Sequence, residues 1–269
     1  MIVRVSARLP RRAEKKITAA LFAAGALSVE RSLAVSGSPL SALADESRRD
    51  AVLDVLSPYD PSCEPVEERD WQNEWISSFE GGEIAPGVTV IPSGGRTAPE
   101  GISIVIDPRD AFGAGTHPTT RLCARLLLDA VSRFSPRSFL DIGTGTGILA
   151  ILASKLGVKR VEGYDIDGAA VVRAQENIRA NGCLDVKLYE ASIHASAEQF
   201  GLVCANVNSA VIERYFEEII VSVDPLGALI LSGIGSEWRR DLERLFAMHN
   251  LSVVSSLEED GWLGYLLRR

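Results

Sequence analysis

The feature that most constrains the fold is a regular alternation of short apolar runs with helix-length segments, which begins at residue 138. Five of these runs have the length of buried strands: SFLDI (138–142), VKRVEGYDI (158–166), DVKLYEA (185–191), GLVCANV (201–207) and ALILSGI (228–234). The segments between them carry helical periodicity or turn residues. Strands joined by crossover helices lie parallel, so the sequence predicts a three-layer α/β fold. Residues 251–260 and 261–269 predict a closing hairpin.

The first 68 residues have a different pattern, which predicts a small α+β module. We expect strands at 2–9, 26–35 and 63–68 and helices at 11–24 and 41–56, with no clear fourth strand. Residues 69–100 are rich in glycine and proline and predict a linker, in which Trp71 and Trp75 share a helix face suited to packing. The expected domains are residues 1–68, 69–100 and 101–269.

Composition limits the possible functions. The chain has 269 residues, of which 46% are hydrophobic, enough for a substantial core. Its net charge of −8 argues against a direct requirement for nucleic acid, because binding to phosphates needs a basic surface. The first 16 residues are locally basic, which predicts a solvated helix face or, alternatively, a surface that docks a partner.

The cysteines and the apolar runs indicate a cytoplasmic protein. Cys63, Cys123, Cys183 and Cys204 form no CxxC pair or Cys/His cluster, so we expect reduced thiols and neither a zinc site nor another metal site. No secretory signal is evident, and no run reaches the ~18 apolar residues that cross a membrane.

The strongest chemical motif is FLDIGTGTGILA (139–150), a glycine-rich loop between a strand and a helix. Glycines in such a loop let the backbone approach a ligand closely. The spacing is GxGxG, and Ile148 stands where a dinucleotide fingerprint has its third glycine. No Gly-Lys-Ser/Thr follows, which excludes a Walker loop. The loop predicts a nucleotide-type site without specifying the ligand.

Two carboxylates narrow the choice of ligand to S-adenosylmethionine. Asp141 comes two residues before the first glycine, where it would repel a pyrophosphate but attract a cationic ammonium or sulfonium group. Asp165 ends the next strand, 22 residues after Gly143, and is placed to accept hydrogen bonds from both ribose hydroxyls. Asp167 is the weaker candidate because it precedes a helix as a capping residue does.

Asn206 is the candidate catalytic residue. It follows the apolar run LVCA at the carboxyl end of its strand, whereas Asn208 or Ser209 is the more natural cap of the next helix. Its amide oxygen could accept a hydrogen bond from an incoming amine and aim the nitrogen lone pair at a methyl group. A turn role for Asn206 is the alternative. No general base is evident, since a loop histidine such as His117 more often makes local hydrogen bonds.

Together with AFGAGTHPTT (111–120) and LILSGI, these motifs resemble the PrmA-type methyltransferases, which modify large-subunit ribosomal protein eleven. The resemblance covers residues 69–269 well and the first 68 weakly. It implies a class I methyltransferase domain, a Rossmann-like three-layer sandwich with a mostly parallel seven-stranded sheet. It also implies a small N-terminal substrate-recognition domain. The implied activity is methylation of lysine side chains and of an N-terminal amine, with S-adenosylhomocysteine as product.

The resemblance also implies a set of cofactor-binding residues. Thr120, Gly143, Asp165 and Asn206 would contact S-adenosylmethionine, with Phe112 and Thr116 lining the pocket; from the loop itself we add Asp141 and Gly145. Two alternatives remain open. One is a related methyltransferase acting on another protein, such as the electron-transfer flavoprotein β subunit. The other is a nicotinamide-dependent oxidoreductase or a catalytically silent nucleotide-binding module.

Overall fold

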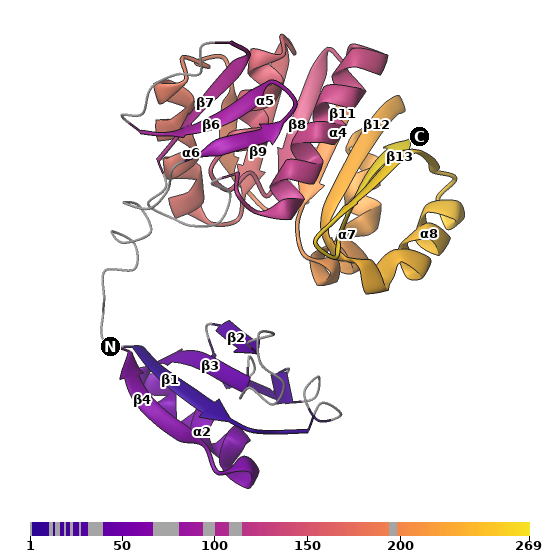
Figure 1. Ribbon diagram of the computed structural model, residues 1–269. Coiled ribbons are helices and arrows are strands. Elements are labelled where there is room, and N and C mark those ends of the chain that lie inside the picture. The colour runs from indigo at the N-terminus through magenta and orange to yellow at the C-terminus, as the bar shows by residue number, and fades with distance from the viewer. Residues whose placement is uncertain are drawn as a thin grey trace. The chain divides into compact units, whose positions relative to one another are not determined.

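The computed structural model divides the chain into two compact units, residues 1–71 and 72–269 (Figure 1). It describes residues 2–10, 40–66, 81–93, 100–107, 115–193 and 198–269, together with residues 13, 17, 18, 20, 21, 24–26 and 28–31. Trp71 and Trp75 lie outside the described residues. Each unit has its own hydrophobic core.

The first unit is a four-stranded antiparallel sheet with a helix packed on it. Its elements are β1 (Ile2–Ala7), β2 (Ser28–Arg31), β3 (Leu40–Asp45), α2 (Arg49–Leu56) and β4 (Ser62–Val66). The strand order is β2-β3-β1-β4. Within the predicted helix 11–24, the described positions 13, 17, 18, 20 and 21 are helical, and residue 24 lies in a turn. The small α+β architecture therefore follows the prediction.

The prediction of one helix over 41–56 is wrong in its first third. Residues 40–45 form β3, the fourth strand that the sequence did not reveal, and the helix begins only at Arg49. Leu40, Ala42 and Ala44 alternate with more exposed neighbours. The alanines and the acidic residues that follow them suggested a helix, but pairing with β1 on one side and β2 on the other overrides this weak preference.

The second unit contains the seven-stranded sheet. Its strands are β8 (Ser138–Ile142), β9 (Arg160–Asp165), β10 (Lys187–Glu190), β11 (Phe200–Asn206), β12 (Val223–Gly235), β13 (Ser252–Glu259) and β14 (Trp262–Arg268). They lie in the order β10-β9-β8-β11-β12-β14-β13. The first five are parallel, and β14 pairs antiparallel with both β12 and β13. The mostly parallel sheet and the closing hairpin are thus confirmed.

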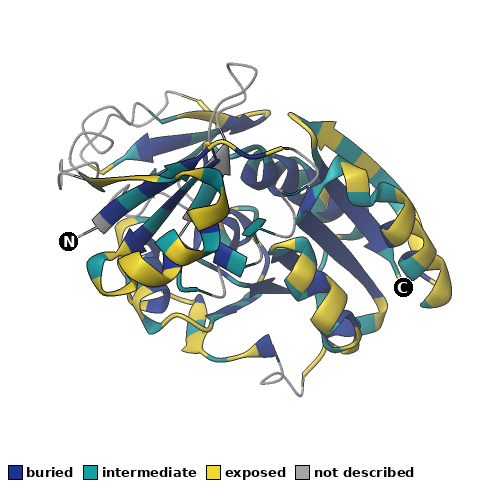
Figure 2. Ribbon diagram, turned by 90° about the horizontal axis from the view of Figure 1, so that it is seen from below, coloured by how far each residue is buried: buried dark blue, intermediate teal, exposed yellow. Residues whose placement is uncertain are grey.

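Helices cover both faces of this sheet and make the unit three-layered. They are α4 (Pro118–Phe134), α5 (Ile148–Lys155), α6 (Gly168–Ala180), α7 (Ser209–Val221) and α8 (Arg239–Met248). Side chains from α4, α5 and α6 share one core cluster, and those from α7 and α8 share the other. Successive residues of a strand serve alternate faces, as Leu202 and Val203 do. Figure 2 shows the buried strands between partly exposed helices.

Part of the predicted linker belongs to the second unit. Within residues 69–100, β5 (Gly82–Ala85) and β6 (Val88–Pro92) are strands, and β6 pairs in parallel with β7 (Ile102–Ile106). The Asn181 side chain, just after α6, accepts from the Val105 N–H at 2.9 Å and donates to its carbonyl at 2.6 Å. The glycines and prolines suggested a connector, whereas backbone pairing of β5, β6 and β7 builds a small sheet that the Asn181 bonds join to the end of α6.

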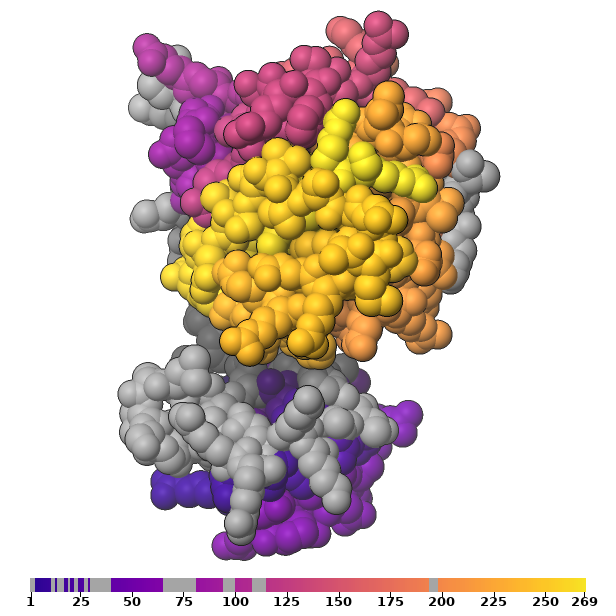
Figure 3. Space-filling model, turned by 90° about the vertical axis from the view of Figure 1, so that its right-hand side faces the viewer, coloured from indigo at the N-terminus to yellow at the C-terminus, as the bar shows by residue number. Residues whose placement is uncertain are grey.

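The C-terminal part of the chain, coloured gold to yellow, gathers on one face of the second unit (Figure 3). Within the described part of the chain, no helix is long and apolar enough to cross a membrane. All four cysteines are free thiols; only Cys63 is exposed.

Candidate functional site

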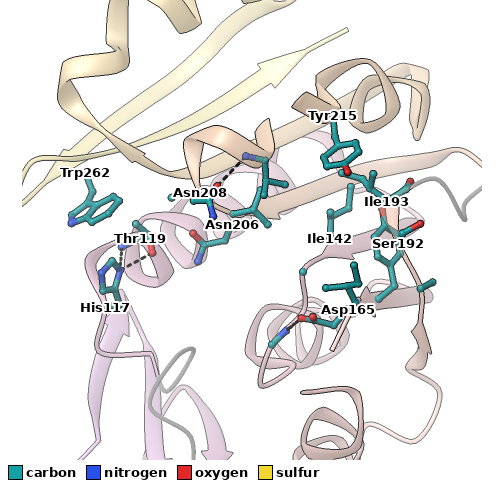
Figure 4. A pocket seen from close by; sticks show the side chains of 18 residues that line it. His117, Thr119, Ile142, Asp165, Ser192, Ile193, Asn206, Asn208, Tyr215 and Trp262 are labelled. Carbon is teal, nitrogen blue, oxygen red and sulfur yellow. Dashed lines mark hydrogen bonds between the residues drawn. The ribbon is translucent and has the colours of Figure 1, made fainter. Parts of the chain in front are cut away.

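A cavity of about 540 Å³ opens at the carboxyl ends of the parallel strands (Figure 4). Its walls come from the ends of β8, β9 and β11 with the loops that follow them, from the loop after β10, from α7, from the start of α4, and from β12 and β14. The predicted residues among its lining are Gly143, Gly145, Asp165 and Asn206. Open α/β sheets bind ligands at this edge, at the point where the strand order reverses. Here the chain adds β9 and β10 on one side of β8, and β11 and β12 on the other.

The glycine loop forms one wall of the cavity, and two of its glycines have left-handed backbone conformations. Gly143 has a φ of 69° and Gly145 a φ of 54°, a conformation that glycine adopts without strain. The Gly143 N–H donates to the Tyr164 carbonyl at 2.9 Å, which fixes the loop against β9. A Cβ added at Gly145 would meet no atom within 4 Å, so this residue faces open space. The loop therefore presents bare backbone to the cavity.

Asp165 lies at the tip of β9 with its carboxylate held by backbone. The Gly145 N–H donates to Oδ2 at 2.9 Å and the Asp167 N–H to Oδ1 at 3.1 Å. A carboxylate oxygen accepts more than one hydrogen bond, so both oxygens keep capacity for ligand hydroxyls. The Asp167 side chain accepts from the Ala169 N–H at 2.9 Å and caps α6, as its sequence position indicated.

Asp141 lies behind the glycine loop and is not part of the cavity lining. It is 1% exposed, and the Thr144 hydroxyl donates to its Oδ2 at 2.8 Å. Burial raises the pKa of Asp141 to about 7, against the lowering effect of the Thr144 bond and of a backbone bond from Ala150, while the nearby Asp165 charge adds to the rise. The geometry therefore places Asp141 in a bracing position under the loop, and the direct ligand contact expected from the sequence stays a prediction.

The raised pKa makes stability depend on pH. An unfolded aspartate has a pKa of about 3.9, so between about pH 4 and pH 7 the folded chain binds more protons at Asp141 than the unfolded chain. The contribution of this group to the free energy of unfolding then falls as pH rises, by up to about 1.4 kcal/mol per pH unit, and levels off above about pH 7. We expect Asp141→Asn to remove this slope in urea unfolding; parallel pH profiles for the two proteins would contradict it.

Asn206 ends β11 at the centre of the cavity wall. Its Oδ1 is buried and has no hydrogen-bond partner among the described residues. The next asparagine, Asn208, instead accepts from the Val211 N–H at 2.9 Å and caps α7. A buried acceptor without a partner costs about 1–3 kcal/mol, so the oxygen is poised for a donor that the ligand or substrate brings.

His117, Thr119 and Trp262 form the wall at one end of the cavity, away from Asp165 (Figure 4). The Thr119 N–H donates to His117 Nδ1 at 3.3 Å, and Nδ1 lies 2.8 Å from the Thr119 hydroxyl oxygen. His117 thereby caps α4, and Pro118 occupies the first helical position. Burial, and then the positive charge of Arg121, lower the pKa of His117. This geometry favours the local role over that of a general base.

The threonines predicted as cofactor-binding residues, Thr116 and Thr120, are not among the residues that line the main cavity. Thr119 lines the cavity, whereas Thr120 is buried on α4 and is not among the lining residues. Thr116 lines a separate cavity of about 130 Å³ beside Arg121. The spacing of THPTT could not decide which threonine lines the cavity, because that depends on how α4 is rotated against the sheet. Phe112 lies outside the described residues.

The sequence reasoning missed several lining residues. Ser192 and Ile193 follow β10, and the rule that found Asp165 after β9 would also have indicated them. Ile166 is 80% exposed and stands beside Asp165 in the wall. Tyr215 on α7 and Trp262 on β14 had no local signal, because only the packing of α7 and the hairpin brings them to the cavity.

The residues present fit S-adenosylmethionine. The cavity offers a carboxylate for a ribose, exposed backbone at Gly145, an unpartnered amide oxygen at Asn206 and a largely apolar wall. Within the described ranges, no group of three or more His, Cys, Asp or Glu side chains could hold a metal ion. The sheet order and this site define a class I, S-adenosylmethionine-dependent methyltransferase.

Comparison with known proteins identifies the family. The model of the family "Ribosomal protein L11 methyltransferase (PrmA)" matches residues 40–269, and the chain belongs to this family. It is 34% identical over 214 residues to the ribosomal protein L11 methyltransferase of Geotalea daltonii, covering 75% of this chain and 68% of that protein. It is 33% identical over 205 residues to that of Staphylococcus aureus, covering 74% and 64%.

A solved structure supports the fold. The ribosomal protein L11 methylase of Lactobacillus delbrueckii subsp. bulgaricus superposes with a TM-score of 0.66 at 28% identity, over 71% of this chain and 98% of that one. The chain spans about two thirds of the length of the two curated relatives.

Proposed function

We propose that this protein transfers methyl groups from S-adenosylmethionine to lysine side-chain amines, and also to an N-terminal amine, of ribosomal protein L11. The main observation behind this proposal is the buried Oδ1 of Asn206. It lacks a hydrogen-bond partner among the described residues and lies in the same cavity as Asp165. An acceptor in that position suits an amine nucleophile, which has hydrogens to donate. Membership of the family named for this substrate supports the proposal.

Each residue has a defined part in this proposal. S-adenosylmethionine, when bound, supplies an electrophilic methyl group on a sulfonium. Asp165 accepts hydrogen bonds from the ribose hydroxyls, and the glycine loop lies against the ligand with Asp141 bracing it from behind. Asn206 Oδ1 accepts an N–H of the incoming amine and so points the nitrogen lone pair into the cavity. Positioning of this kind accounts for much of the rate of a bimolecular displacement.

The amine has to be neutral before it can attack. A lysine ammonium has a reference pKa of about 10.4, and an apolar wall together with a nearby cation lowers it. Tyr215, Trp262 and Ile193 supply apolar surface around the cavity. His117 Nδ1 is engaged by the backbone of Thr119, so we assign no general base. We propose no metal and expect S-adenosylhomocysteine as the product.

The alternatives receive less support. The GxGxG spacing disfavours a nicotinamide cofactor, and the family match disfavours the electron-transfer flavoprotein as substrate. We propose that the first unit recognises the protein substrate and that the reaction takes place in the cytoplasm without direct involvement of nucleic acid or membrane.

The test is incubation of the purified chain with ribosomal proteins and isotopically labelled S-adenosylmethionine, followed by mass spectrometry. We expect label on lysines of ribosomal protein L11 and on no other ribosomal protein. Calorimetric titration with S-adenosylmethionine and with NAD separates cofactor choice from substrate choice. Label on a different protein would refute the substrate assignment, and tight binding of NAD alone would refute the methyltransferase activity.

A further inference from the structure

One ionic cluster of the second unit lies next to the cavity without lining it. Glu259 ends β13 at the tip of the terminal hairpin, and Arg121 and Arg125 lie one turn apart on α4. We propose that Glu259 is a positioning residue that clamps the start of α4 to this hairpin and thereby fixes the methyl-acceptor end of the cavity. By the acceptor end we mean the wall of His117, Thr119 and Trp262, away from Asp165. The inference rests on the proposed function, because that function assigns the ribose to Asp165 and leaves this end for the acceptor.

The contacts of the cluster join three segments. Arg121 Nε donates to Glu259 Oε1 at 2.5 Å, and the Arg125 guanidinium donates to Oε2 of the same carboxylate. A second nitrogen of Arg121 donates to the backbone carbonyl of Thr116. A guanidinium can make both contacts at once because its donors are arranged as a rigid fork. Glu259 thus connects the hairpin, through Arg121, to the backbone just before α4.

The two segments that this connection joins also carry His117 and Trp262, which form the acceptor wall. Thr116 immediately precedes His117, and Trp262 follows Glu259 by three residues. The His117 and Trp262 rings make an edge-to-face contact with their centroids 5.1 Å apart. A shift of either segment would therefore move the wall that faces Asn206.

The clamp is more buried than the neighbouring ion pair. The Arg121, Arg125 and Glu259 side chains are 26%, 35% and 23% exposed. In the neighbouring pair, the Arg239 side chain is 36% exposed and the Glu258 side chain is 50% exposed. This pair links the same strand, β13, to the beginning of α8. Removing Glu259 would leave two guanidinium groups facing each other at i,i+4 spacing, with Asp260, at 3.6 Å, as the remaining carboxylate paired with Arg121 among the described residues. Repulsion between the two guanidinium groups would then displace the start of α4 from the hairpin.

His117 and Trp262, whose segments the clamp joins, lie at the opposite end of the cavity from Asp165 (Figure 4). The ribose contacts assigned to Asp165 do not involve α4 or the hairpin. Loss of the clamp is therefore expected to slow methyl transfer while leaving cofactor affinity almost unchanged.

The kinetic test compares Glu259→Ala with Glu258→Ala, which removes the adjacent ion pair from the same strand. We expect Glu259→Ala to lower kcat for methyl transfer about 10-fold or more, since small misplacements in an active site have effects of this size. The Kd of S-adenosylmethionine should stay within about threefold of wild type, and Glu258→Ala should change neither quantity. Arg121→Lys keeps a positive charge but lacks the fork, so we expect a loss of turnover similar to that of Glu259→Ala.

A second measurement does not depend on catalysis. The Thr120 and Arg121 N–H groups bond to the His117 carbonyl at 3.0 and 3.2 Å, so hydrogen exchange of these amides reports on the first turn of α4. We expect about 10-fold faster exchange in Glu259→Ala but not in Glu258→Ala. Equal protection in both variants, turnover of Glu259→Ala equal to that of Glu258→Ala, or a cofactor affinity that falls as much as turnover would overturn the inference. If wild type methylates no ribosomal protein, the proposed function fails and the exchange result alone decides whether the clamp exists.

Discussion

Replacing Asp165 by alanine is expected to weaken binding of S-adenosylmethionine about 100-fold. Hydrogen bonds to a charged group contribute about 1.5–3 kcal/mol, and the carboxylate is placed to accept from two ribose hydroxyls. It also fixes the glycine loop through the Gly145 N–H. The measurement is calorimetric titration of the purified variant.

The matched control is Asp167→Ala, two residues along the same loop. Asp167 caps α6, so its loss should cost about 1 kcal/mol of stability without a large change in cofactor affinity. Asp165→Ala is expected to lose cofactor affinity, whereas its thermal unfolding temperature should stay near that of wild type. Wild-type affinity in Asp165→Ala would remove this residue from the cofactor site.

Replacing Asn206 by alanine is expected to lower the single-turnover rate of methyl transfer about 100-fold, with cofactor affinity within a few-fold of wild type. The reason is that Oδ1 is held ready for the substrate amine, and losing one preorganised acceptor from an active site has an effect of this order. The fold should tolerate the change, since no described residue depends on Oδ1.

Ser232→Ala provides the comparison for Asn206→Ala. Ser232 is the neighbour of Asn206 in the register of β12, is buried, and donates to the Leu263 carbonyl at 2.8 Å. Its loss should reduce stability with little effect on the transfer rate. A transfer rate in Asn206→Ala that matches this control would reject the positioning role.

Local patterns predicted the second unit well because its elements follow strong, short-range rules. Period-two apolar runs, crossover helices and capping residues such as Asp167 and Asn208 depend on neighbours close in the chain. The same rules place Asp165 and Asn206 at one edge of the sheet, because parallel strands end together. The first unit was harder to predict: the run that forms β3 is paired by strands distant in sequence.

By itself the sequence determined the alternation of strands and helices from residue 138 onward, the glycine loop, and the aspartate and asparagine of the cavity. Only the tertiary structure decided which side chains line the cavity: Thr119 and Trp262 do, whereas Thr120 and Asp141 are buried outside the lining. It also turned residues 82–92 from an expected linker into strands. The physical reason is that the period of a helix or strand fixes which residues share a face, whereas packing against distant segments fixes where that face points.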